Sequence, residues 1–239
     1  MRTPSRYLVL GAGRTGGHLP HFFPEDTQLD IVTSTNPITD DALHNAAAAI
    51  VFLPTVVMQD MIDTLIDARI PAVIGTTAVR WPRDLNQRLV DARTPWILGS
   101  NFSLGMNLLV SIASFLGDTL RTAPEAFANT TLDIHEVHHT HKQDKPSGSA
   151  VTLHDALGSL DTPVPITAER TGDVAGRHTL NLNLPHETLS LTHDVRDRSV
   201  FAQGAAWAAQ HLLPELEPGL HHFQQQLQNH LRNQRHDTA

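Results

Sequence analysis

Residues 7–16 of the chain read YLVLGAGRTG, an apolar run that ends on a glycine-rich turn. Gly11, Gly13 and Gly16 follow the G-x-G-x-x-G spacing. In that spacing the first glycine allows a tight turn, the second lets a pyrophosphate approach the backbone, and the third lets a helix pack closely on a strand. Free amide groups at the start of the following helix attract phosphates. The stretch therefore predicts a strand, a turn and a helix that bind a dinucleotide, with a glycine turn that binds no ligand as the alternative.

The first hundred residues alternate between strand-like and helix-like segments. Strands that alternate with helices imply crossover connections and a parallel sheet. We therefore expect an α/β fold whose N-terminal domain is a Rossmann-like, doubly wound parallel sheet. The short apolar runs are Tyr7–Leu10, Leu29–Val32, Ala46–Leu53, Ala72–Ile74 and Trp96–Leu98, and the helical patterns are Met58–Ala68 and Pro82–Asp91.

The pattern changes after a long helical segment at Leu104–Thr119. Extended segments with alternating side chains follow at Thr130–Val137, Thr179–Leu184 and Thr188–His193. Such alternation suits an open, partly antiparallel sheet. It indicates a second, α+β domain with an open mixed sheet.

These patterns set the expected domain boundaries. Residues 1–103 form the dinucleotide-binding domain, which C-terminal helices at about 199–239 complete. Residues 104–198 form the substrate-binding domain. The two tail helices are expected at Gly204–Leu213 and Gly219–Arg232.

Composition narrows the class of protein. The 239 residues include 40% hydrophobic and 18% charged residues, which is typical of a soluble globular chain. A net charge of −8 argues against a nucleic-acid partner, since the phosphate backbone favours a basic face. No apolar run approaches the ~20 residues that cross a bilayer, and the first residues show no signal-peptide pattern. We therefore expect a cytoplasmic protein. The chain has no Cys, which excludes disulfides and a cysteine nucleophile.

Small residues follow three of the expected strands, at Thr33–Asn36, Gly75–Ala78 and Gly99–Ser103. Ligands of an open parallel sheet bind beyond the carboxyl ends of its strands, so these clusters are candidate cofactor contacts. An NAD-selective domain places an acidic residue after its second strand, but here Ser34 offers only a neutral hydrogen bond. NADPH and NADH both remain candidates. The absence of a carboxylate that would repel the extra phosphate slightly favours NADPH or dual use.

The strongest signal for chemistry is the run HEVHHTHKQDKPSGSA at residues 135–150. A helical pattern follows at Ala150–Leu160, and Ser147 or Ser149 suits its N-cap. The turn thus presents hydroxyl and amide groups at the positive end of a helix, where a carboxylate binds well. Lys142 and the histidines add positive charge and proton donors. The run predicts a site that binds and protonates a small anion.

Two other interpretations of this run compete. His135, His138, His139 and His141 resemble a cluster of metal ligands, as in a histidine-based metal carrier. In an extended strand, however, their side chains alternate between faces, and Lys142 would repel a cation. We therefore expect no metal site. A histidine-rich surface loop without a function is the second alternative.

Three runs of the chain, taken in order after the glycine turn, carry a family resemblance: GTTA (75–78), SNFSLGMNLL (100–109) and EVHHTHKQDKPSGSA (136–150). Further matches are RTG (170–172), GRHT (176–179), and His193 with Arg198 ahead of FAQGA (201–205). The chain resembles the 4-hydroxy-tetrahydrodipicolinate reductase (dihydrodipicolinate reductase) family of bacterial lysine and diaminopimelate synthesis. The resemblance extends from the first strand to about Gly204.

The resemblance implies a role for each matching residue. His138 is the proton donor and acceptor, and Lys142 is a second donor. His139, Gly148 and Ser149 contact the substrate, the last two through a carboxylate. With Ser34, the expected contacts of NADPH or NADH are Gly11, Ala12, Gly13, Arg14, Thr15, Gly16, Gly75, Thr76, Thr77, Gly99, Ser100, Asn101, Phe102 and Arg198.

The resemblance also implies a reaction and an assembly. Family members transfer hydride from NAD(P)H to a ring carbon of a cyclic imine dicarboxylate, after which the adjacent carbon is protonated to yield tetrahydrodipicolinate. They are commonly homotetramers assembled through the sheet of the second domain.

The chain departs from the family pattern at several positions. Its glycine turn is one residue shorter than G-x-x-G-R-M-G, Ala78 replaces the glycine that usually ends GTTG, and Lys145 replaces a usual Ala. These departures leave two alternatives: a divergent reductase of another cyclic imine, and a non-catalytic NADPH-binding sensor.

Overall fold

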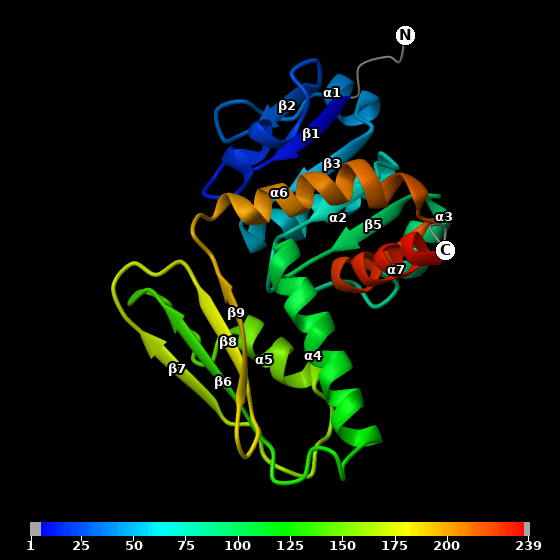
Figure 1. Cartoon of the computed structure of the whole chain (residues 1–239). Helices are drawn as coiled ribbons and strands as arrows, with labels where there is room; N and C mark the ends of the chain where they lie inside the picture. Colours follow the sequence, from blue (N-terminus) through cyan, green and yellow to red (C-terminus); the bar gives the residue numbers. More distant parts are fainter. Residues whose placement is uncertain (1–5, 237–239) are drawn as a thin grey trace. The chain divides into compact units, whose positions relative to one another are not determined.

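The computed structural model describes residues 6–236, and the side chains of residues 6–233 (Figure 1). The chain divides into two compact units. The first unit runs from the start of the described chain to Ser103 and resumes at Ser199, whereas the second is Leu104–Arg198. The first unit is therefore built from two stretches of sequence on either side of the second.

A six-stranded sheet forms the centre of the first unit. The strand order is β10-β5-β4-β3-β1-β2, and every neighbouring pair is parallel. The order reverses at β1, so the carboxyl ends of β1 and β3 flank the place where ligands of such sheets bind. This confirms the expected doubly wound sheet. The strands are β1 (Arg6–Leu10), β2 (Gln28–Val32), β3 (Ala48–Val51), β4 (Ala72–Ile74), β5 (Pro95–Leu98) and β10 (Gly219–His222).

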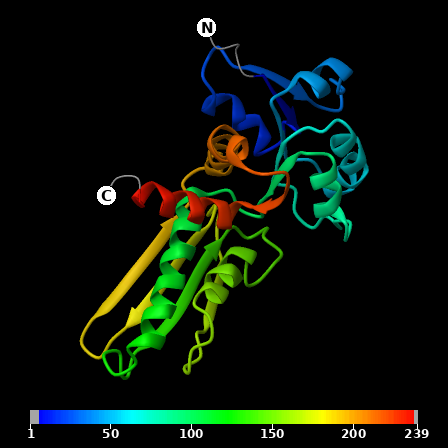
Figure 2. The same ribbon diagram turned by 90° about the vertical axis from the view of Figure 1, so that its right-hand side faces the viewer.

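Helices cover both faces of this sheet (Figures 1 and 2). Leu8 and Leu10 share a buried core with the three helices of one face, α1, α2 and α3. The other face is covered by η1, α6 and α7. Because both faces are buried, the strands are continuous apolar runs rather than alternating ones. The helices are α1 (Asp40–Asn45), α2 (Thr55–Asp67), α3 (Leu85–Asp91), η1 (Gly16–Phe22), α6 (Ser199–Trp207) and α7 (Phe223–His236).

The segment after the glycine turn differs from the expected helix. It forms only a seven-residue 3-10 helix, η1, with no side-chain cap at Thr15. Gly16 and Gly17 have low helix propensity, and Pro20 lacks the amide donor that an α-helix requires. The expected helix start is therefore missing, so the turn has only its own backbone amides to offer a phosphate.

The tail also differs from its prediction. The predicted helix Gly219–Arg232 begins as strand β10, which pairs with the edge of β5, and helix α7 starts only at Phe223. Pro218 and Gly219 disfavour a helix, whereas the edge of β5 offers unpaired backbone groups to a strand. The other tail helix, α6, starts at Ser199, earlier than predicted, and continues as a π-helix at Ala208–Leu212 and a 3-10 turn at Leu213–Glu215.

The second unit is a four-stranded mixed sheet with two helices on one face (Figure 2). The strand order is β7-β6-β8-β9, with β7 parallel to β6 and the other pairs antiparallel. This confirms the expected mixed sheet, although β7 has no counterpart among the predicted strands. The elements are α4 (Leu104–Thr122), β6 (Thr131–His138), α5 (Gly148–Ala156), β7 (Ile166–Arg170), β8 (Arg177–Asn183) and β9 (Thr188–Asp194).

The two faces of this sheet differ in character. Leu132, Ile134 and Leu180 point toward α4 and α5 and form the core of the unit. The other face is polar, and there Asp133 accepts hydrogen bonds from Asn181 and Asn183. Among the described residues, no helix is long and apolar enough to cross a membrane.

Candidate active site

A row of polar side chains crosses one end of the second sheet. Glu136 and His138 are two residues apart on β6, so both point to the face that carries α5. Strand register places His178 of β8 opposite Glu136, and Arg170 of β7 beside His138. His193 of β9 lies opposite His178. Four strands thus contribute titratable or charged groups to one place.

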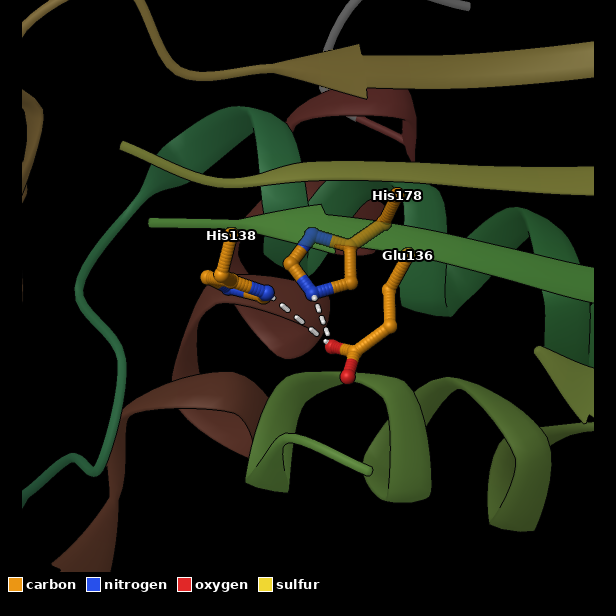
Figure 3. A group of neighbouring side chains, drawn as sticks. All are labelled: Glu136, His138 and His178. Atoms are coloured by element: carbon orange, nitrogen blue, oxygen red, sulfur yellow. Dashed lines mark ion pairs between the residues drawn. The ribbon is translucent and has the colours of Figure 1, made fainter. Parts of the chain in front are cut away.

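Glu136 is the centre of this row. Its side chain is fully buried, and each carboxylate oxygen has a different set of neighbours. Oε1 accepts hydrogen bonds from the backbone N–H of Ser147 and from Nη2 of Arg170, both at 2.9 Å. Oε2 lies 3.2 Å from Nδ1 of His138 and 3.6 Å from Nε2 of His178 (Figure 3). The carboxylate therefore joins α5 and β7 to the two imidazoles.

Burial sets the charge of these groups. It lowers the pKa of His178 to about 4, and the nearby His138 adds to the effect. Burial also lowers the pKa of His138, with Lys142 and Arg170 acting in the same direction and Glu136 opposing them. Burial alone would raise the pKa of Glu136, but the hydrogen bonds from Ser147 and Arg170 outweigh it and hold that pKa below its usual value. Burial therefore disfavours a positive charge on both imidazoles, whereas the hydrogen bonds favour the charged form of Glu136.

Helix α5 starts beside this carboxylate. Ser147 is its N-cap, because the Ser147 Oγ accepts a hydrogen bond from the backbone N–H of Ala150 at 3.2 Å. The expected N-cap is thus confirmed, with Ser147 rather than Ser149 in that role. Gly148 and Ser149 follow as the first residues of the helix, and Gly148 N–H donates to Asp144 at 3.4 Å. The backbone amides of Gly148 and Ser149 lie at the positive end of a nine-residue helix.

Lys142 and His139 lie in the turn that leaves β6. The Lys142 backbone N–H donates to His139 O, and its Nζ pairs with Asp144 Oδ1 at 2.8 Å. The ammonium group lowers the pKa of the Asp144 carboxyl. The rings of His139 and His141 are 6.3 Å apart. The expected substrate and proton-transfer groups, His138, His139, Lys142, Gly148 and Ser149, thus all belong to one strand end, one turn and one helix start.

The histidines of residues 135–141 do not gather as a metal site. His135 points to the opposite face of β6, where its Nε2 is 3.7 Å from Glu169. Within the described residues, the ligand atoms that do lie within 4.8 Å of one another belong to Glu136, His138 and His178. Arg170 already donates to Glu136 and Lys142 lies nearby, and both cations oppose a third positive charge. We therefore interpret this group as one that handles protons.

The expected cofactor loops share the carboxyl edge of the first sheet. Gly11–Gly16 follow β1, Ser34 follows β2, Gly75–Thr77 follow β4 and Gly99–Phe102 follow β5. Because all these strands are parallel, their carboxyl ends lie along the same edge. The sheet topology therefore brings these loops together.

The glycine turn has the shape that its spacing predicts. Gly11 has a φ of +94°, and a Cβ there would lie 2.5 Å from the carbonyl oxygen of Phe52. A Cβ at Gly16 would lie 1.8 Å from the carbonyl oxygen of Gly11. A Cβ at Gly13, in contrast, meets no atom within 4 Å. The turn is closed on the protein side and open at Gly13, which fits the close approach of a pyrophosphate.

Two other expected cofactor residues have distinct environments. Phe102 is 2% exposed and packs against Phe223, with ring centroids 4.6 Å apart, so its side chain belongs to the core. Its carbonyl oxygen packs closely against Gly204, where a Cβ would lie only 1.7 Å away. Arg198 is exposed and is the last residue of the second unit.

Reasoning from sequence missed part of the site. Glu136, Ser147, Arg170, His178 and His193 were not predicted as site residues, although they lie in the runs that carry the family resemblance. The alternation of His178 with Leu180 on β8 indicates which face it takes. Nothing local indicates that this face meets Glu136, because the pairing joins distant parts of the chain.

Fold and site together define a class of protein. A Rossmann-like unit with an open glycine turn, and a second unit with a proton-handling cluster beside a helix start, are typical of nicotinamide-dependent oxidoreductases. Residues 105–227 match the family described as dihydrodipicolinate reductase, C-terminus. The chain belongs to the dihydrodipicolinate reductase family.

Individual relatives agree with this membership. A 4-hydroxy-tetrahydrodipicolinate reductase of Xylella fastidiosa (strain 9a5c) is 30% identical over 225 residues, which cover 87% of this chain and 92% of that protein. The enzyme of the same name from Alkaliphilus oremlandii (strain OhILAs) is 28% identical over 90% of this chain and 95% of its own. The fold is similar to that of a dipicolinate-bound dihydrodipicolinate reductase from Paenisporosarcina sp. TG-14, with a TM-score of 0.70, 15% identity, and coverage of 92% of this chain and 98% of that one.

Proposed function

We propose that the protein reduces 4-hydroxy-tetrahydrodipicolinate, a cyclic imine dicarboxylate, to tetrahydrodipicolinate in lysine and diaminopimelate synthesis. The reaction consumes one NAD(P)H and one proton and releases water and NAD(P)⁺. The observation that carries the proposal is the placement of His138 and Lys142 beside the start of α5 in a chain of this family.

The helix start and Lys142 supply the recognition of a dicarboxylate. The backbone amides of Gly148 and Ser149 lie at the positive end of α5, where a carboxylate is stabilised by hydrogen bonds and by the helix dipole. Among the described residues, the ammonium group of Lys142 forms an ion pair with the exposed Asp144, and an incoming carboxylate can compete for it. His139, which directly follows β6, would contact the substrate, as the family resemblance implies.

His138 and Lys142 supply protons to the reduced ring. A bound nicotinamide supplies the hydride, and the added electron pair increases the negative charge on the imine system. A positioned proton donor stabilises that charge more in the transition state than in the ground state. Burial lowers the pKa of His138 in the free protein, and a bound dicarboxylate would raise that pKa by adding negative charge nearby. Substrate binding would thus protonate His138 when the proton is needed.

The first unit would hold the nicotinamide cofactor at the carboxyl edge of its sheet. The open backbone at Gly13 suits the pyrophosphate. After β2, Thr33 Oγ1 accepts hydrogen bonds from the backbone amides of Thr35 and Asn36, which leaves Ser34 exposed at the turn. No carboxylate in this turn would repel a 2′-phosphate or favour free ribose hydroxyls, so we expect the protein to use NADPH and NADH, with NADPH at least as good.

A steady-state assay tests the function. The imine is generated from pyruvate and aspartate semialdehyde, and loss of reduced nicotinamide absorbance is followed. His138→Gln and Lys142→Ala should still bind NADPH but lose about 100-fold to 10,000-fold in turnover, the usual contribution of a proton donor. Unchanged turnover would remove the role of the residue concerned. NADPH binding without consumption would favour the non-catalytic sensor, and reduction of other imines only would favour a divergent reductase.

We also propose a homotetramer assembled through the sheet of the second unit, as the family resemblance implies. The polar face of that sheet, with Asp133, Asn181 and Asn183, is the surface that would be buried. Light scattering of the purified protein tests this assembly, and a monomer at micromolar concentration would contradict it.

A further inference from the structure

Glu136 has a position that the proposed reaction does not by itself explain. A carboxylate that is fully removed from water is costly unless it is paired and hydrogen-bonded. Ser147 and Arg170 already satisfy Oε1. Within the part of the chain that the structure describes, Oε2 has no hydrogen bond and faces the rings of His138 and His178 (Figure 3). The second oxygen is therefore a buried charge directed at the proposed proton donor.

The ring of His138 has two distinct sides. Nδ1 faces Glu136 Oε2 at 3.2 Å, without the alignment of a full hydrogen bond. Nε2 faces Gly176, where a Cβ would lie 3.1 Å away, so glycine keeps that nitrogen uncovered. A carboxylate next to Nδ1 favours a proton on Nδ1 and leaves Nε2 to exchange protons with a ligand. Such contacts often tighten only when substrate binds.

We propose that Glu136 is a positioning residue that holds His138 in its Nδ1–H tautomer and couples it to the start of α5. This inference rests on the proposed function. One oxygen orders Ser147, and with it the amides that would bind a carboxylate, while the other orients the proton donor. A single buried group would thereby position both the amides that bind the carboxylate and the imidazole that donates the proton.

The groups around His138 come from every neighbouring strand. Arg170 of β7 and Lys142 of the following turn disfavour its positive charge, whereas Glu136 and Asp144 favour it. His178 of β8 packs edge-on, with ring centroids 5.0 Å apart, and His193 of β9 lies behind it. Glu136 is the buried anion among them, so its removal should change the titration of His138 most.

The test is the substitution Glu136→Gln. Glutamine keeps a carbonyl oxygen for Ser147 and Arg170, but it puts an amide donor where Oε2 faces His138. The amide donor favours the Nε2–H tautomer of His138, and the substitution removes the negative charge of Glu136. We expect kcat to fall by about 100-fold or more, with KM for the imine changed much less. The limb of the pH profile that reports loss of the His138 proton should move to lower pH.

Nitrogen NMR of His138 gives a readout that does not depend on turnover. The wild-type protein should show the Nδ1–H tautomer, and Glu136→Gln should show Nε2–H. Asp155→Asn is the matched control, because Asp155 is an exposed carboxylate of the same unit whose Oδ1 lies 3.3 Å from an imidazole nitrogen, Nδ1 of His154. It should leave kcat, the pH profile and the tautomer unchanged.

The outcomes separate the two proposals. Wild-type kcat and pH profile in Glu136→Gln, or an unchanged His138 tautomer, would overturn the positioning role. Loss of activity with an unchanged pH profile would also overturn it, because a merely structural defect gives that result. If the wild-type protein reduces no imine, the proposed function fails, while the tautomer change still tests the action of Glu136 on His138.

Discussion

The hydroxyl oxygen of Ser147 lies 3.2 Å from Nε2 of His178. Ser147 is the N-cap of α5 and its backbone N–H donates to Glu136, so one residue connects the helix start, the buried carboxylate and a buried imidazole. The proposed anion-binding and proton-transfer parts of the site are therefore joined by short side chains rather than by a flexible loop. Stability and ligand binding should respond together when this connection is changed.

Ser147→Ala removes the cap of α5. Loss of a serine N-cap costs about 0.5 to 2 kcal/mol, and here a buried imidazole also loses its partner. We expect the free energy of unfolding to fall by about 2 kcal/mol, and dipicolinate, used as a substrate analogue, to bind more weakly. Urea unfolding and calorimetric titration measure the two effects. Thr119→Ala, which removes an exposed hydroxyl in α4, is the control and should change stability by less than about 0.5 kcal/mol.

Gly16 and Gly13 should respond differently to alanine. At Gly16 the new Cβ would lie 1.8 Å from a backbone oxygen, so we expect a loss of about 3 kcal/mol or more in stability. At Gly13 the Cβ has open space, so folding should be unchanged. It would occupy the place proposed for the pyrophosphate, and the Kd for NADPH should rise by about tenfold or more. Wild-type NADPH binding in a folded Gly13→Ala would contradict this placement of the cofactor.

The pKa of His178 predicts how stability depends on pH. It is lowered from about 6.5 to about 4 in the folded protein, so between these values the unfolded chain binds more protons. His178 therefore favours the folded state fully above about pH 6.5, and this contribution is lost as pH falls toward 4. Its size is about 3 kcal/mol. Unfolding of His178→Gln at several pH values should show a shallower decline than wild type. Thr119→Ala, which removes no titratable group, should follow the wild-type curve.

Ser34→Asp introduces the acidic residue that the turn after β2 lacks. A carboxylate there would repel the 2′-phosphate of NADPH and accept hydrogen bonds from the ribose of NADH. We expect the ratio of kcat/KM for NADPH to that for NADH to fall by about tenfold or more. The KM for the imine should not change, because Ser34 belongs to the first unit. An unchanged ratio would show that this turn does not contact the ribose.

Local patterns allowed much of the fold to be predicted. The strands around Leu8, Val73 and Ile97 were predicted correctly, because a short apolar run between two helical patterns is typical of a buried strand. Two of the differences, η1 and β10, occur where prolines and glycines weaken the helix, and at β10 the edge of β5 also offers a partner. Strand β7 was not predicted, since only its pairing with β6 makes it a strand.

The sequence by itself determined the alternation of strands and helices in the first hundred residues, the glycine turn, and the run that carries His138 and Lys142. These features depend on neighbouring residues, so hydrophobic periodicity and motif spacing in the sequence indicate them directly. The tertiary structure alone decided that Arg170, His178 and Ser147 meet at Glu136, and that burial lowers the pKa of His138. A pKa and a buried ion pair depend on which distant strands pair and in what register, and no local pattern contains that information.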